Sequence, residues 1–452
     1  MAMDTNLFRQ LPQVNHLVDA ESLRSEVELY GRDVVVRSCR NIIDMAREHI
    51  KNHAQVPSED ELIDSVKRNL VERPYLYRSV INATGVILHT NLGRAPIAQE
   101  AWKAMEIAGG YCDLEMLLET GKRASRQRDV EACLQKVCGS EAGIIVNNCA
   151  GAILLSLAAL AGEKPTAISR GHLIEIGGGF RLPTIMEASG SPLYEVGTTN
   201  RTHLKDYEEA LAGDIGLILL VHRSNFTIQG YVTEPDPREI IRAAKEKGVP
   251  VVLDLGSGAI EDPGKDGLPA EDTVEQALKE GFDAVCFSAD KLLGGPQAGV
   301  IVGKSAVIDK LKKHPLARAL RCDKVQLAGV CATLDLYARG EAKTKIPIWQ
   351  MMLQSPEELR ARAAYWRDQL GRGELVDTPD AVGGGSLPGE ELPGVALAID
   401  VAGPEEFLET LRTGEPAIVG HIREDRVLFH PRTVSKENDD LFVAGLKTAL
   451  DA

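Results

Sequence analysis

Residues 284–296 read AVCFSADKLLGGP, and this stretch decides the fold that we expect for the chain. Its apolar run has the length of a buried strand, and it leads to Lys291 and a glycine-rich turn. An earlier apolar run, residues 250–254, ends on Asp254. Ligands of open α/β sheets bind at the carboxyl ends of the strands, so the residues that end these two runs are the first candidates for a site.

Short apolar runs recur on both sides of this stretch, with helical segments such as 239–247 and 273–280 between them. There are seven such runs, at residues 143–147, 167–170, 194–197, 217–222, 250–254, 284–288 and 300–303. The alternation predicts a seven-stranded, mostly parallel sheet that is covered by helices on both faces. We therefore expect a large α/β domain over residues 79–340.

The two ends of the chain have different patterns. Residues 1–75 carry apolar side chains at three-to-four spacing, which predicts a small helical domain with a linker. Its helices are expected at 22–30, 34–53 and 58–72. Residues 341–452 alternate helices with strands, which predicts a small C-terminal α+β domain whose first strand, 395–401, follows a glycine-rich loop at 383–388.

The composition is that of an acidic globular protein. The 452 residues are 44% hydrophobic and carry a formal net charge of −15, which argues against a disordered chain and against a general nucleic-acid coat. No apolar run approaches the ~20 residues of a membrane span, and the start lacks a secretory signal, so we expect a cytoplasmic protein. The eight cysteines show no C-x-x-C pair or zinc spacing with histidine, so no metal site is expected.

Lys291 and Asp254 together favour a pyridoxal 5'-phosphate site. A lysine at a strand end inside a glycine-rich turn is placed to form a Schiff base, and this cofactor uses such a lysine with an acid on its pyridine nitrogen. The acid keeps the ring protonated as an electron sink, while the lysine anchors the cofactor and carries the α-proton. Either residue alone would instead indicate a surface lysine beside Asp290 or a strand-end cap at Asp254.

A third feature fits the phosphate of this cofactor. Residues 146–152, VNNCAGA, leave a strand and open a helix. The backbone N–H groups of Ala150, Gly151 and Ala152 lie at the positive end of the helix dipole, where they can bind a phosphate. Ser288 is the right type to add a hydroxyl donor. Small residues also serve close packing, and a dinucleotide site is less favoured because no G-x-G-x-x-G follows a first strand.

Three arginines are candidates for an oxyanion pocket. Arg318 and Arg321 are three residues apart, on one face if their segment is helical, and Arg94 lies in a loop bounded by glycine and proline. Guanidinium groups bind oxyanions with two parallel hydrogen bonds, so three of them converging would hold a phosphate-like group. Arg318 and Arg321 taken alone are also compatible with a solvated surface pair.

With these features in place, the chain resembles the bacterial selenocysteine synthase family, the L-seryl-tRNA(Sec) selenium transferases. The resemblance covers nearly the whole length in ordered blocks. These blocks are residues 7–14, 81–86, 91–96, 121–123, 169–171, 175–178, 196–200, 224–226, 290–299, 383–388 and 422–426.

The resemblance implies a fold-type-I pyridoxal-phosphate enzyme with an added N-terminal helical domain that recognises a special tRNA. It also implies a homodecamer built as a ring of dimers. By motif, Lys291 is the Schiff-base lysine and Asp254 the partner of the pyridine nitrogen. Arg94, Arg318 and Arg321 match positions that line the pocket for selenophosphate, and Asn225, in the block 224–226, is assigned to cofactor binding.

The chain departs from the family pattern at two positions. The family has an asparagine triplet where this chain reads Asn147-Asn148-Cys149, so a side-chain contact from position 149 is in question. The family often has glutamate where this chain has His172. A histidine after that strand is expected either to stack on the cofactor ring or to be a polar loop residue.

The expected reaction converts L-seryl-tRNA(Sec) to L-selenocysteinyl-tRNA(Sec), by elimination of the seryl hydroxyl and addition of selenium from selenophosphate. One alternative is a pyridoxal-phosphate lyase acting on a free amino acid or amino sugar phosphate. Another is a non-catalytic RNA-binding protein on a decayed enzyme fold.

The charge of the N-terminal region gives the tRNA interpretation little support by itself. Residues 1–80 hold 11 Lys and Arg against 13 Asp and Glu, a net charge of −2. One segment carries a cluster of arginines that are candidates for phosphate contacts: Arg32, Arg37, Arg40 and Arg47. The same pattern is equally compatible with a solvated helix face.

Overall fold

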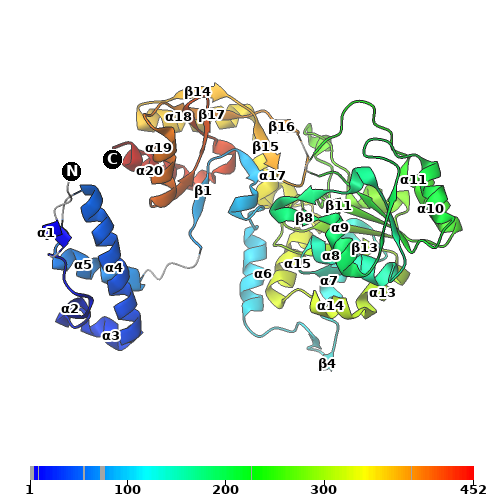
Figure 1. Cartoon of the computed structure of the whole chain (residues 1–452), viewed down its shortest axis with the longest axis horizontal. Coiled ribbons are helices and arrows are strands. Elements are labelled where there is room, and N and C mark those ends of the chain that lie inside the picture. The colour runs from blue at the N-terminus through cyan, green and yellow to red at the C-terminus, as the bar shows by residue number, and fades with distance from the viewer. Residues whose placement is uncertain are drawn as a thin grey trace. The chain divides into compact units, whose positions relative to one another are not determined.

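The computed structural model describes residues 5–8, 10–53, 56–71, 77–224, 226–387 and 389–451 (Figure 1). The chain divides into two compact units, Met1–Ser79 and Val80–Ala452. Within the described residues, no helix combines the length and the apolar character that crossing a bilayer requires.

The first unit is helical, as predicted. Its helices are α1 (Thr5–Phe8), α2 (Val14–Val18), α3 (Arg24–Tyr30), α4 (Arg32–His53) and α5 (Glu59–Val71). Leu17, Leu23, Val35 and Val66 are fully buried and form its core. Ser58 starts α5 because its backbone N–H donates to the Glu61 carboxylate (2.8 Å) while the Glu61 N–H donates to the Ser58 hydroxyl (3.3 Å). Residue 72, the expected end of this helix, lies outside the described residues.

The second unit contains the predicted seven-stranded sheet, in the order β5-β13-β12-β11-β10-β6-β9. The strands are β5 (Ala142–Val146), β6 (Thr166–Ser169), β9 (Leu193–Val196), β10 (Leu217–Val221), β11 (Val251–Gly256), β12 (Ala284–Ser288) and β13 (Gly299–Gly303). Strand β13 runs antiparallel to both of its neighbours, and the other pairs are parallel. The sheet is therefore mostly parallel, which confirms the prediction.

Alternate side chains of these strands belong to two separate cores. In β13, Val300 and Val302 pack in one cluster, while Ile301 packs in the other. A strand points successive side chains to opposite faces, so both faces must be covered for all of them to be buried. Helices α7 (Arg128–Cys138), α11 (Pro237–Glu246), α12 (Val274–Glu280) and α15 (Lys324–Ala338) contribute to the first core, and α8 (Cys149–Leu160), α9 (Leu182–Ser189) and α13 (Ser305–Lys313) to the second.

The C-terminal part contains a four-stranded sheet in the order β14-β17-β20-β19. Its strands are β14 (Glu374–Asp377), β17 (Val395–Ile399), β19 (His421–Arg423) and β20 (Arg426–Phe429), and its helices are α18 (Pro356–Leu370), α19 (Pro404–Thr413) and α20 (Asp439–Asp451). Trp366 and Phe429 pack against Phe442, with ring centroids 4.2 and 5.5 Å apart. The alternation of helices and strands confirms the predicted α+β character.

The prediction for the glycine-rich loop was wrong in one respect. Two strands, β14 and β15 (Asp380–Gly383), precede the loop at 383–388, which therefore does not come before the first strand of this part. The segment 417–423 forms two strands, β18 (Ala417–Val419) and β19. They separate at Gly420, where a Cβ would lie 2.7 Å from the Phe429 ring. Pro388 lies outside the described residues.

Two short strands join the beginning of this unit to its C-terminal part (Figure 1). Strand β1 (Val80–Asn82) pairs in parallel with β18, and β2 (Val86–Leu88) pairs in parallel with β15. These pairings fix the direction in which the loop after β15 leaves the sheet.

A buried ionic cluster anchors β15. The Asp380 carboxylate contacts His430 Nδ1 at 2.5 Å and Arg432 Nε at 2.6 Å, and all three side chains are almost fully buried. Arg432 also donates to the backbone carbonyls of Met351 (2.8 Å) and Pro393 (2.6 Å). Every one of these contacts bridges segments that are far apart in the sequence.

We expect Asp380→Asn to lower the free energy of unfolding of the second unit by about 3–5 kcal/mol, because it leaves the buried Arg432 charge without its partner. Urea denaturation followed by circular dichroism measures this change. The matched control is Asp335→Asn, which removes an exposed carboxylate 3.0 Å from Arg339 and should leave the midpoint almost unchanged. Equal midpoints for both variants would contradict the anchoring role of Asp380.

Candidate active site

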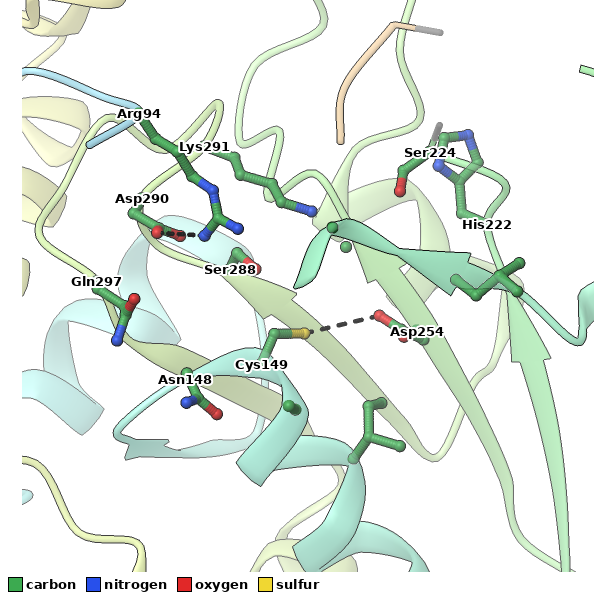
Figure 2. A pocket seen from close by; sticks show the side chains of 15 residues that line it. Arg94, Asn148, Cys149, His222, Ser224, Asp254, Ser288, Asp290, Lys291 and Gln297 are labelled. Carbon is green, nitrogen blue, oxygen red and sulfur yellow. Dashed lines mark hydrogen bonds and ion pairs between the residues drawn. The ribbon is translucent and has the colours of Figure 1, made fainter. Parts of the chain in front are cut away.

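A pocket of about 200 Å³ lies at the carboxyl ends of β10, β11 and β12 (Figure 2). Arg94 and Asp290 lie at one side of it, and His222 and Ser224 at the opposite side. Its lining consists of Arg94, Asn148, Cys149, Ala150, Ile153, Ile174, Gly177, His222, Ser224, Asp254, Gly256, Ser288, Asp290, Lys291 and Gln297. Lys291 and Asp254, predicted from separate strand ends, therefore share one pocket.

Lys291 is a buried amine that projects into this pocket, 7% exposed. The turn that carries it requires glycine at position 294, where φ is +75° and a Cβ would lie 2.3 Å from Ile346. A Cβ on Gly385 would lie 2.5 Å from Lys291 Nζ, so the loop after β15 packs against the amine. Among the described residues, no carboxylate lies within 4.0 Å of Nζ, which leaves the amine available for chemistry.

Asp254 lies across the pocket in β11, also buried. Burial raises the pKa of its carboxyl group, and the charge of Lys291 opposes part of that rise. Cys149 Sγ lies 3.7 Å from Asp254 Oδ1, and burial raises the pKa of this thiol well above its ordinary value. Position 149 therefore does contact the acid, through a neutral thiol.

The start of α8 offers fewer free donors than predicted. The Gly151 N–H donates to Asn148 Oδ1 (2.8 Å) and the Ala152 N–H to the Asn148 carbonyl (3.0 Å). The first four N–H groups of a helix lack intrahelical partners, so the N–H groups of Cys149 and Ala150 remain free to bind a ligand. Ala150 and Ser288 line the pocket, whereas Gly151 and Ala152 do not.

The three predicted arginines do not converge within one chain. Arg94, with φ of +64°, lines the pocket, and its Nη1 lies 2.7 Å from Asp290 Oδ2. Arg318, in α14 (Pro315–Ala319), and Arg321 are exposed and do not line the pocket. Their segment nevertheless runs beside the start of α8, where the Asn147 N–H donates to the Leu320 carbonyl (2.8 Å).

His172 lines a neighbouring pocket and is not part of the pocket around Lys291. Its Nε2 lies 3.6 Å from Glu234 Oε1. The contact with His172, together with the Arg223 guanidinium, lowers the pKa of Glu234 to about 2. His172 is thus held by a carboxylate that stays charged at neutral pH.

His222 and Ser224 are pocket residues that the sequence analysis missed. His222 directly follows β10. We selected Asp254 and Lys291 because each is a polar residue at the end of an apolar strand, and the same rule would have selected His222. Asn225, the remaining predicted cofactor contact, lies outside the described residues.

Comparison with known proteins agrees with this geometry. A family model described as "L-seryl-tRNA selenium transferase" matches residues 80–435, and one described as "Selenocysteine synthase N terminal" matches residues 8–47. The chain is 41% identical to the L-seryl-tRNA(Sec) selenium transferase of Carboxydothermus hydrogenoformans, covering 97% of both chains. It is 40% identical to that of Geobacter sulfurreducens, covering 98% of this chain and 99% of the relative.

Among solved structures, a D-glucosaminate-6-phosphate ammonia-lyase matches with a TM-score of 0.61. It is 18% identical, and the match covers 84% of this chain and 98% of that one. At this identity the likeness concerns the fold alone.

We expect Asp254→Asn to raise the melting temperature of the cofactor-free protein at pH 8 by about 1–2 °C, because the amide removes a buried charge. The wild-type carboxyl has a raised pKa in the folded state, so its destabilising charge appears as the pH rises and disappears as the pH falls. The gap between variant and wild type should therefore be smaller at pH 5 than at pH 8. Differential scanning fluorimetry at both pH values tests this, and a gap that widens toward pH 5 would contradict it. Asp335→Asn should follow the wild type at both.

Proposed function

Since the chain belongs to the L-seryl-tRNA(Sec) selenium transferase family, it converts seryl-tRNA(Sec) to selenocysteinyl-tRNA(Sec), and we propose that the pocket around Lys291 carries out this reaction. The observation that supports this location is a buried amine and a buried carboxyl group at the ends of neighbouring strands, facing the same pocket. Of two other pockets, the one beside His172 has no lysine in its lining, and the one beside Cys331 has only Lys324, at the start of α15.

The fold is that of fold-type-I pyridoxal-phosphate enzymes, and the pocket fits this cofactor. Lys291 Nζ is buried and has no ion-pair partner among the described residues. An amine that forms a covalent bond to an aldehyde carbon must be free of such a partner. Asp254 would hold the proton on the pyridine nitrogen. The free N–H groups of Cys149 and Ala150 and the hydroxyl of Ser288 would bind the phosphate. When bound, the cofactor supplies an electron sink for the α-carbon of the seryl group.

The protein's own part in the chemistry is to move one proton and to hold two charges. We assign the transfer of the seryl α-proton to Lys291 Nζ, because it is the basic group at the centre of the pocket. The Asp254 carboxylate would offset the positive charge of the protonated ring. Burial strengthens that interaction, since the surroundings screen it less than water does.

For the selenium donor, selenophosphate, we propose Arg94 as a direct ligand. Its guanidinium lies at the edge of the pocket and is tethered by Asp290, which fixes its direction. Arg318 and Arg321 are proposed as further donor ligands on the basis of family motif. In one chain they lie on an exposed segment beside the start of α8, so their participation goes with the proposed assembly into a homodecamer, a ring of dimers.

We propose that the first unit binds tRNA(Sec), which also places the protein in the cytoplasm. The N-terminal family model covers α2, α3 and most of α4. On α4, Arg32 and Arg47 form ion pairs with Asp19 and Asp44. Arg37 and Arg40 are exposed and form no ion pair with a described residue, so we assign the phosphate contacts to these two.

The two alternative functions are less well supported. A lyase on a free amino acid or amino sugar phosphate has no use for a tRNA-binding unit, and this chain matches the N-terminal family model. A decayed, non-catalytic protein would have no reason to keep a buried lysine and a buried aspartate, because each is costly in a folded core.

We expect the purified protein, given pyridoxal phosphate, seryl-tRNA(Sec) and selenophosphate, to form selenocysteinyl-tRNA(Sec), and Lys291→Ala to form none. The variant should also lose the visible absorbance that borohydride removes, because the amine that holds the cofactor is gone. The matched control is Lys279→Ala, which removes an exposed lysine 2.8 Å from Glu275 and should keep both properties. A borohydride-sensitive band in Lys291→Ala would show that another residue holds the cofactor.

We expect Arg318→Ala to slow the addition of selenium by about tenfold or more while leaving elimination of the seryl hydroxyl nearly intact, because only the addition uses the anionic donor. Single-turnover assays with and without selenophosphate separate the two steps. Arg339→Ala, on the surface in an ion pair with Asp335, serves as the control. Equal losses in both steps would remove Arg318 from the donor site.

A further inference from the structure

Four buried polar atoms in and beside the Lys291 pocket have no hydrogen-bond partner among the described residues. They are His222 Nδ1, Ser257 Oγ, Glu271 Oε1 and Ser386 Oγ. Buried polar atoms in folded proteins are almost always hydrogen-bonded, so such atoms indicate a site that is kept ready for a partner.

Three of the four side chains come from segments that line the Lys291 pocket or pack against Lys291. His222 follows β10 and lines the pocket, and Ser257 follows β11, where its carbonyl accepts from the Leu292 N–H (3.0 Å). Ser386 follows Gly385, the residue that packs against Lys291 Nζ. Glu271 lies just before α12.

Glu271 is the member of this group whose burial is most costly. It is 6% exposed, and no lysine or arginine among the described residues lies within ion-pair distance of its carboxyl group. Burial raises its pKa, which the nearby Ser257 hydroxyl and Leu387 N–H oppose only in part. His222 is an ionisable neighbour of opposite charge type, with Nδ1 4.0 Å from Oε1.

We propose that Glu271 is a positioning residue for selenium transfer: its carboxyl group pairs with His222 Nδ1 and orients the imidazole, so that Nε2 is directed to the pocket. This inference rests on the proposed function of that pocket. The present separation is longer than a hydrogen bond, and contacts of this kind commonly tighten only when substrate is bound. A carboxylate on one ring nitrogen fixes which nitrogen is left for the reaction.

The same carboxyl group also connects His222 to the loop that covers Lys291. Leu387, two residues beyond Gly385, has φ of +47°, a conformation that is unfavourable for leucine. The Leu387 N–H lies near the Glu271 carboxyl group, which favours that backbone direction. Glu271 therefore lies between His222 and the segment that follows Gly385.

A double-mutant cycle on the cofactor-loaded protein tests the pairing. We expect Glu271→Ala and His222→Asn each to lower kcat about tenfold with KM for seryl-tRNA(Sec) within about twofold, and the double variant to be no slower than His222→Asn alone. Glu271→Gln should recover part of the rate, because its amide oxygen still accepts from Nδ1–H. Glu275→Ala, an exposed glutamate in α12, is the matched control.

The absorbance spectrum of the bound cofactor gives a readout that does not depend on turnover. Glu271→Ala and His222→Asn should shift the visible band in the same direction, since both free the same ring. The proposal would be overturned if the losses of kcat in the two single variants multiplied in the double variant. It would also be overturned if Glu271→Ala had a normal kcat and only a lower melting temperature. If Glu271→Ala does not fold, Glu271→Gln completes the cycle. If the wild type forms no selenocysteinyl-tRNA, the proposed function fails, while the spectra still decide whether Glu271 acts through His222.

Discussion

The site depends on the register of three parallel strands. Val221 of β10 lies opposite Asp254 of β11, and Asp254 lies opposite Cys286 of β12. This register brings His222, Asp254 and Lys291 to one edge of the sheet, although they are spread over seventy residues of sequence. The register shifts at Gly256, whose φ of +69° turns the backbone. Glycine adopts this φ without strain, and the turn brings the backbone at position 256 next to Lys291 Nζ.

The other walls of the pocket form where backbone segments lie close together. The antiparallel strand β13 carries Gly299 so near to the start of α8 that a Cβ would lie 2.0 Å from the Asn148 carbonyl oxygen. On the opposite side, the pairing of β2 with β15 and the buried Asp380 cluster direct the loop after β15 onto Lys291. The pocket therefore combines the central sheet with a segment from the C-terminal part of the chain.

Buried charged side chains are paired in the C-terminal part, whereas Glu271 beside the site has no lysine or arginine partner among the described residues. Arg362, which is buried in the C-terminal part, donates to Asp439 and to the carbonyls of Pro431 and Val434. His222, which lines the pocket, and Glu271, which lies beside His222, each have a buried atom without a hydrogen-bond partner among the described residues. Leaving such atoms unpaired destabilises the fold, and proteins tolerate that cost where ligand binding or chemistry recovers it.

The sequence by itself determined the order of strands and helices and the two residues at the centre of the site. Those features are local, because apolar periodicity and a polar residue at a strand end can each be recognised from a few consecutive residues. The tertiary structure decided which candidates meet. His222 rather than His172 lines the pocket, since that depends on the order of strands in the sheet. Asn148 takes the donors of Gly151 and Ala152, and Arg318 and Arg321 face solvent, because caps and helix faces depend on contacts between segments that are distant in the chain.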